Sequence, residues 1–112
     1  MRAGDLVRVD FGIPIGSGPG FVRPAIVVTA DLILAGRPRT MHVVPVTSNV
    51  VRRLPTEIDV KAASLTVPSV AQCHLCTVVS AEHLVEGSIG DNVGAVTLAQ
   101  IRSVLADLFD IA

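Results

Sequence analysis

Residues 16–28 read Gly-Ser-Gly-Pro-Gly-Phe-Val-Arg-Pro-Ala-Ile-Val-Val, a glycine-rich segment followed by an arginine, a proline and an apolar run. Glycine adopts backbone angles that other residues resist, so a loop is expected first. Pro24 has no N–H to donate, which suits the first residue of a strand. The apolar run at 25–28 is typical of a buried strand. The loop therefore places Arg23 at the rim of a sheet, where a guanidinium can hold a phosphate; the alternative is an ordinary arginine in a surface turn.

The composition predicts one domain over residues 1–112. Half of the residues are hydrophobic, which is enough for one core, and the three aromatic residues are all Phe, so the core must be aliphatic. Residues 1–61 carry eight of the nine Lys and Arg and five of the ten acids, a balance of +3, whereas residues 62–112 carry −4. The first half can offer a cationic surface to an anionic partner; ordinary scatter of surface charge is the alternative.

The N-terminus enters a strand-like pattern directly after Met1, without the pattern of a signal peptide. No apolar run approaches the roughly 18–20 residues that a membrane span needs. We therefore expect a cytoplasmic protein with no membrane partner. In that compartment the two cysteines are expected to be thiols rather than a structural disulfide.

Hydrophobic patterning predicts mostly strands followed by a terminal helix, an α+β fold built around a small, strongly curved barrel. A proline near the end of the third strand implies an edge or a bulge there. Thr97 and Gln100 fit a capping box at the start of the helix, whose apolar stripe contains Leu98, Ile101, Val104, Leu105 and Leu108. The expected strands cover residues 5–10, 25–28, 39–47, 56–60, 70–79 and part of 87–96, with short helical turns within 29–37 and 80–84.

Four parts of the chain, in order and spacing, resemble the MazF/PemK toxins of type II toxin–antitoxin systems. They are residues 2–5 (Arg-Ala-Gly-Asp), residues 22–28 (Val-Arg-Pro-Ala-Ile-Val-Val), residues 43–49 (Val-Val-Pro-Val-Thr-Ser-Asn) and the final helix. The resemblance implies an SH3-like (CcdB/PemK-type) β-barrel with a C-terminal α-helix, working as a homodimer. It also implies sequence-specific, metal-independent cleavage of single-stranded RNA without a cofactor. A MazE-like antitoxin with an acidic, disordered tail is the implied protein partner.

By position, the resemblance implies that Arg23 and Thr47 are the catalytic residues. Ser17 falls in the loop that borders the RNA groove of the family, and Ser48 and Asn49 continue the loop after the threonine. The next loop also holds Arg52 and Arg53, which we expect to grip RNA phosphates and to steepen the salt dependence of binding. A solvated loop that contacts only the antitoxin, or nothing, is the alternative for these two arginines.

These residue types suit a metal-free reaction in which the RNA 2′-OH attacks the adjacent phosphate. The products are a 2′,3′-cyclic phosphate and a free 5′-OH. The phosphorane carries more negative charge on its oxygens than the ground state, so an arginine aimed there stabilises the transition state selectively. A threonine hydroxyl can donate to the same oxygens, and removing one such donor costs on the order of 3 kcal/mol of barrier. Arginine holds its proton too firmly to be an easy base, so Arg23 is assigned electrostatic stabilisation first and proton donation second.

Two departures from the family pattern alter groups that face RNA. Family members usually carry an acidic residue and a glutamine in the loop, where this chain has Gly18 and Pro19. Aligned on Thr77, the family's acidic, glutamine and basic positions hold Cys73, His74 and Cys76. Because histidine titrates near neutral pH, we advance the hypothesis that His74 assists proton transfer in place of the missing carboxylate. A plain surface or dimer-interface histidine is the alternative.

The Cys73-His74-Leu75-Cys76 sequence also matches half of a zinc site or a redox dithiol. A tetrahedral site needs four ligands, and the remaining histidines lack matching spacing. In an extended strand, residues three apart point to opposite faces. We therefore expect structural thiols and no metal.

Two alternatives to a ribonuclease come from other classes of protein. The first is a CcdB-like gyrase poison, a non-enzymatic binder on the same barrel, against which Arg23 and Thr47 argue. The second is a catalytically weakened homologue that binds RNA or an antitoxin as a regulator, which the departures at 18–19 and 73–76 favour. The fold alone does not decide among them.

Overall fold

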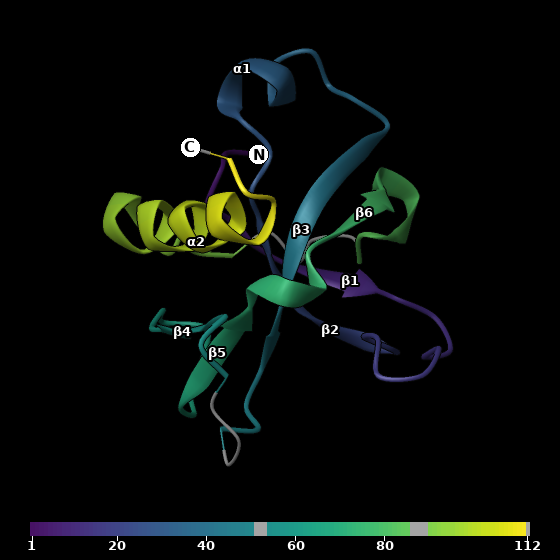
Figure 1. Cartoon of the computed structure of the whole chain (residues 1–112). Coiled ribbons are helices and arrows are strands. Elements are labelled where there is room, and N and C mark those ends of the chain that lie inside the picture. Colours follow the sequence, from purple (N-terminus) through teal and green to yellow (C-terminus); the bar gives the residue numbers. More distant parts are fainter. Residues whose placement is uncertain (51–53, 86–89, 112) are drawn as a thin grey trace.

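The structure is a computed structural model that describes residues 1–50, 54–85 and 90–111. Six strands form one antiparallel sheet, with helices and single 3₁₀ turns between and after them (Figure 1). The strands are β1 (Leu6–Asp10), β2 (Val22–Val27), β3 (Thr40–Thr47), β4 (Glu57–Val60), β5 (Ser69–Gln72) and β6 (Thr77–Ser80). The helices are α1 (Asp31–Leu34) and α2 (Ala95–Leu108), and the 3₁₀ turns are η1 (Cys73–Leu75) and η2 (Ala81–His83).

β3 is the centre of the sheet because it pairs with three other strands. β2 lies on one edge, where Ala25 is opposite Pro45. On the other edge β6 pairs with the first part of β3, up to Val43, and β5 pairs with Val46 and Thr47. β1 then pairs with β2, and β4 with β5. The strand that carries the proposed catalytic threonine therefore changes partner shortly before it ends.

Pro45 lies in this central strand and is fully buried, so, of the edge or bulge expected at this proline, the edge strand is wrong. The proline falls between the stretch of β3 that pairs with β6 and the stretch that pairs with β5. η1 connects β5 to β6 at the same place. A residue without an N–H fits here because the ladder on that edge is already interrupted.

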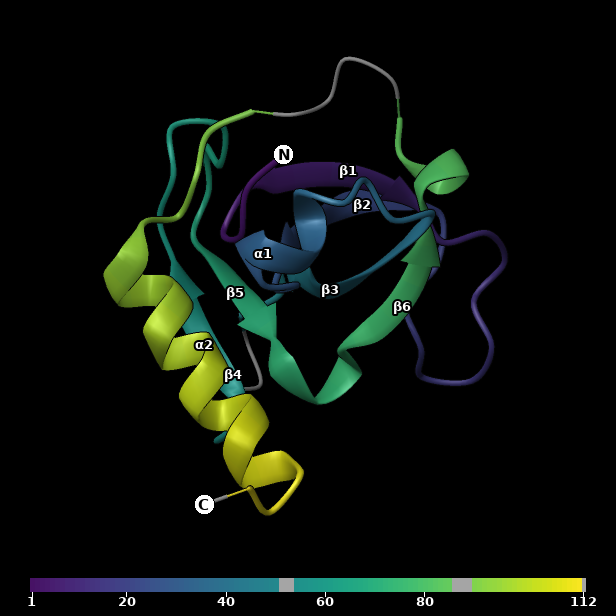
Figure 2. The same cartoon turned by 90° about the horizontal axis from the view of Figure 1, so that it is seen from above.

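Two aliphatic cores lie on the two faces of the sheet. One contains Val44 and Val46 of β3 and is covered by α2, whose Ile101 is fully buried. The other contains Val43 of β3 together with Leu34 of α1. Figure 2 shows α2 alongside β4 and β5, on the side of the molecule away from the β1–β2 loop. Each buried aliphatic side chain contributes about 1.5–3 kcal/mol.

The fold class is α+β, as expected, with a curved antiparallel sheet and a C-terminal helix. The sheet is not a closed barrel, because no ladder among the described residues joins β1 to β4. Apart from the ladder with β2, the pairing of β1 and the residue before it in the described ranges consists of two isolated bridges, from Val9 to Leu84 and from Asp5 to Asn92. The bridge at Asn92 stands where a last short strand was expected, and residues 86–89 of that segment lie outside the described ranges.

Two local expectations are wrong. The strand expected over 70–79 is broken by η1, which turns the chain so that β5 and β6 meet different parts of β3. α2 begins at Ala95 rather than at Thr97, and no side chain caps it. Its N-cap is Gly94 with φ +88°, whose N–H donates to Oδ1 of Asn92 (2.8 Å). A positive φ favours glycine, so the start of the helix is set by the backbone at Gly94 and not by a threonine.

Candidate active site

Arg23 and Thr47 lie at neighbouring strand ends on one face of the sheet. Ala25 is opposite Pro45, and extending this register by two residues aligns Arg23 with Thr47. Alternate residues of a strand point to the same face, so both side chains share the face that carries Val43. The ladder between β2 and β3 ends at Ala25, directly after Pro24, which cannot donate a hydrogen bond. The two ends are thereby released from backbone pairing with each other.

The Arg23 side chain is half-buried and incompletely paired. Its Nε atom is buried without a hydrogen-bond partner. Val9 of β1 is opposite Arg23 and is fully buried. The arginine side chain therefore starts from a closely packed part of the sheet. A buried unpaired donor costs free energy, so this geometry is typical of a site that awaits a ligand rather than of a surface turn.

Thr47 is half-buried, and its Oγ1 accepts a hydrogen bond from the backbone N–H of Asn49 (3.1 Å). This bond fixes the threonine at the start of the following turn and uses only the acceptor side of the hydroxyl. The hydroxyl proton remains available for donation. Ser48 and Asn49 are exposed in that turn, and Arg52 and Arg53 lie outside the described residues.

The glycine-rich loop closes on itself at two phenylalanines. Phe11 N–H donates to the carbonyl of Phe21 (2.9 Å), and Phe21 N–H donates to the carbonyl of Gly12 (2.6 Å). Gly20 lies so close to Pro14 that an added Cβ would stand 2.5 Å from the proline ring, so only glycine fits there. Ser17 is exposed at the far part of this loop. The loop is thus a defined hairpin end, and Arg23 follows it by two residues.

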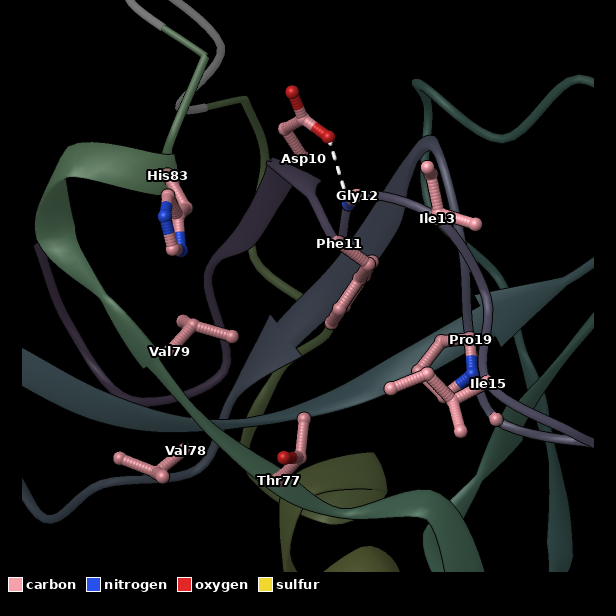
Figure 3. A pocket seen from close by; sticks show the side chains of 11 residues that line it. Asp10, Phe11, Gly12, Ile13, Ile15, Pro19, Thr77, Val78, Val79 and His83 are labelled. Atoms are coloured by element: carbon pink, nitrogen blue, oxygen red, sulfur yellow. Dashed lines mark hydrogen bonds between the residues drawn. The ribbon is translucent and has the colours of Figure 1, made fainter.

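A pocket of about 420 Å³ opens between this loop and β6. Phe11 and Thr77 point into the same space from opposite walls, with His83 on a third side, as Figure 3 shows. Ile13 and Ile15 of the loop line it while 84% and 89% exposed. Arg23 and Thr47 do not line this pocket. Phe11, which does, lies two residues after Val9, the residue opposite Arg23, and therefore on the same face.

Sequence reasoning did not find Thr77 and His83 as parts of one pocket wall with Phe11. Thr77 served only as an alignment point, and His83 is an isolated histidine in the sequence. These residues meet because the segment after β6 returns to β1, where Leu84 bridges Val9 and the N–H of Val85 donates to the carbonyl of Arg8 (2.9 Å). Contacts between strands so distant in sequence leave no local pattern that a reader could recognise.

His74 lies on η1 and is exposed. Its Nδ1 is 2.9 Å from Oγ1 of Thr56, a contact that holds the ring against the start of β4. The hydrogen-bond partner of this ring is therefore Thr56 and neither Arg23 nor Thr47.

Cys73 and Cys76 are free cysteines, the first residue of η1 and the residue directly after it. Burial raises the pKa of Cys73 to about 11, with a further contribution from nearby Cys76, and burial also raises the pKa of Cys76. The argument that residues three apart point to opposite faces is wrong here, because the segment is a 3₁₀ turn. Within the described ranges no group of three or more His, Cys, Asp or Glu side chains could hold a metal ion. Neutral thiols match the structural role expected from the sequence.

None of the helices in the described part of the chain has the length and apolar character needed to cross a membrane. The longest described here, α2, has 14 residues and lies against the sheet.

Solved structures with the same fold include several toxins. A MazF from Deinococcus radiodurans is 27% identical, with a TM-score of 0.81 over 98% of this chain and 96% of that one. The Mycobacterium tuberculosis toxin MazF-mt6 is 20% identical, with a TM-score of 0.73 over 96% of this chain and 98% of that one. A MazE–MazF complex from Deinococcus radiodurans contains a chain that is 25% identical, with a TM-score of 0.73 over 100% of this chain and 97% of that one.

None of the curated proteins matches the sequence significantly. The family model of PemK-like, MazF-like toxins of type II toxin–antitoxin systems matches residues 2–109. The match begins before β1 and ends just after α2, so it includes every strand that positions Arg23, Thr47 and the pocket. This chain therefore belongs to the PemK-like, MazF-like toxin family of type II toxin–antitoxin systems.

Proposed function

We propose that this toxin is an endoribonuclease that cuts single-stranded RNA without a metal or other cofactor. The observation that carries the proposal is that Arg23 and Thr47 each lie two residues beyond the last β2–β3 pair, Ala25 with Pro45, and on the same face of the sheet. Arg23 supplies a permanent cation, and Thr47 presents a hydroxyl whose proton is not used by its bond to Asn49. A phosphate between them can receive charge-assisted bonds from both.

In the proposed mechanism, the RNA 2′-OH attacks the adjacent phosphorus and the bond to the 5′-oxygen breaks. The 2′-oxygen loses its proton and the departing 5′-oxygen gains one, which gives a 2′,3′-cyclic phosphate and a 5′-OH. Arg23 and Thr47 donate to the non-bridging oxygens as their charge increases. His74 remains the candidate for assistance in proton transfer. Its hydrogen bond to Thr56 uses Nδ1, so that bond does not involve the second ring nitrogen, Nε2.

The substrate path is proposed to run past the glycine-rich loop and the turn after β3. Ser17 is exposed in the loop that precedes β2, and Ser48 and Asn49 are exposed in the turn that follows β3. Arg52 and Arg53 continue the second turn in the sequence and are proposed to hold phosphates. The pocket of Phe11 and Thr77 offers an apolar wall on which a base can stack.

We further propose an acidic, MazE-like antitoxin as the protein partner and a homodimer as the working unit, in the cytoplasm. Solved complexes of related toxins with MazE and with a cognate antitoxin support the first point. Exposed apolar side chains that line the pocket, among them Ile13 (84% exposed) and Val78 (54% exposed), support a surface that another chain covers.

The test is to incubate the purified protein with a long RNA of mixed sequence in EDTA and to map both new ends. The proposal predicts discrete cuts with 5′-OH and cyclic-phosphate ends, and their loss in Arg23→Ala. RNA binding without cuts would indicate a regulator instead, and the absence of both would direct attention to a non-enzymatic target such as gyrase. For His74, the His74→Gln variant should shift the pH profile of cleavage; an unchanged profile would exclude its role.

A further inference from the structure

A second buried polar atom lies on the face that carries Arg23 and Thr47. Oε1 of Gln72 is buried without a hydrogen-bond partner, and among the described residues it and Nε of Arg23 are the only buried side-chain nitrogen or oxygen atoms in that state. One is an acceptor and the other a donor. Unpaired buried groups are rare and costly in folded proteins, so two complementary ones near one site call for an explanation.

The sheet register places both side chains on the same face. Thr47 is opposite Val70 of β5, and Gln72 lies two residues beyond Val70. Arg23 aligns with Thr47 from the other edge of β3. Because paired residues and alternate residues share a face, Arg23, Thr47 and Gln72 all project from the same side of the sheet.

The distance between the two strands is within reach of these side chains. β2 and β5 flank β3, so the two Cα atoms are about two strand spacings and two residues apart, roughly 12 Å on a flat sheet. Each side chain extends about 5 Å from its Cα to the atom concerned. When both side chains extend towards each other over β3, their two reaches and a hydrogen bond of about 2.9 Å span this distance, so Nε of Arg23 and Oε1 of Gln72 can meet.

We infer that Gln72 is a positioning residue for Arg23 in the proposed cleavage reaction. When an RNA phosphate engages the outer guanidinium nitrogens, Nε–H of Arg23 donates to Oε1 of Gln72, and the plane of the guanidinium is fixed beside the Thr47 hydroxyl. Hydrogen bonds at catalytic sites are commonly unformed in the free enzyme and tighten in the complex. The role rests on the proposed ribonuclease function.

The test compares Gln72→Met, which keeps the length of the side chain and removes the acceptor, with Gln72→Glu, which keeps an acceptor. Gln72→Met is expected to lower the single-turnover cleavage rate about 10- to 100-fold, the range for one hydrogen bond to a charged group. Affinity for an RNA with 2′-O-methyl groups should stay unchanged, and the melting temperature should stay equal or rise, because an unpaired buried atom has been removed. Gln72→Glu should retain most of the rate.

Two further variants make the result specific. Gln100→Met changes an exposed glutamine on α2 and serves as the matched control, with no expected change. Arg23→Lys lacks the Nε–H, so adding Gln72→Met to it should slow cleavage no further. Three results would each overturn the inference while the ribonuclease function stands. Gln72→Met could cleave at the wild-type rate, its loss of rate could follow from a lower melting temperature, or its effect could multiply with that of Arg23→Lys. Absence of cleavage by the unmodified protein would overturn both.

Discussion

At the scale of single residues, the site depends on which strand face each side chain occupies. Arg23 and Thr47 were expected from their positions in sequence segments that resemble the family, and each lies two residues beyond the last β2–β3 pair on the same face. Gln72 carried no comparable signal. Its relation to Arg23 depends on the β3–β5 pairing, which joins residues more than twenty positions apart, and on the burial of one atom. Local periodicity shows which residues of a strand share a face, but not which strand lies beside it.

The thiols give a prediction at this scale. Because burial raises the pKa of Cys73 to about 11 from 9.0, both thiols should stay neutral and react slowly with a disulfide reagent at pH 7 in the folded protein. The unfolded chain loses the Cys73 proton near pH 9 while the native state keeps it, so this group lowers the free energy of unfolding as pH rises from about 9 towards 11. Thiol labelling with and without urea checks the first point, and urea unfolding at pH 8 and 10 checks the second. Rapid labelling of both cysteines in the native protein would contradict it.

At the scale of elements, periodicity predicted which segments are strands and which is the long helix, but not how each begins or breaks. The strand over 70–79 is split because β5 and β6 both need the same edge of β3, and η1 takes up the change of direction. The apolar stripe of α2 is correct for Leu98 and Ile101, which are buried, whereas Leu108 at the end of the helix is 42% exposed. Tertiary pairing therefore overrides local propensity at these boundaries.

The start of α2 gives a prediction for this scale. Gly94→Ala should lower the free energy of unfolding by roughly 1 to 2 kcal/mol, because a Cβ is strained at φ +88° even where no other atom is near. Thr97→Ala should change it by less than about 0.5 kcal/mol, because Thr97 is inside the helix and does not cap it. Urea denaturation measures both, with Gly36→Ala as a control at a glycine outside the positive-φ region. A large loss in Thr97→Ala with none in Gly94→Ala would restore the capping box.

At the scale of the whole molecule, the fold class followed from the order of strands and final helix, and the family followed from segments spread over most of the chain. Whether the sheet closes into a barrel could not be predicted from the sequence, because closure depends on whether the two end strands pair with each other. β1 and β4 are the end strands of the order and lack a shared ladder in the described residues. The pocket beside the glycine-rich loop belongs to this scale as well, since its walls come from β1, β6, η2 and the loop.

The homodimer is a prediction about the assembled molecule. Sedimentation equilibrium at micromolar concentration should give twice the 11.7 kDa chain mass, because two copies would place two Arg23 and Thr47 pairs on one symmetric assembly. A mass of a single chain over the whole concentration range would contradict the prediction.

The central claim is that Arg23 and Thr47 form one catalytic centre acting on one phosphate. A double-mutant cycle tests it most directly, by comparing single-turnover cleavage of one mapped RNA site in EDTA by the wild type, Arg23→Ala, Thr47→Ala and the double variant. Residues that act as a unit have non-additive effects on the barrier. The account predicts losses of about 100-fold or more in each single variant and little further loss in the double variant. Two losses that multiply, or a Thr47→Ala variant that cuts at the wild-type rate, would contradict it.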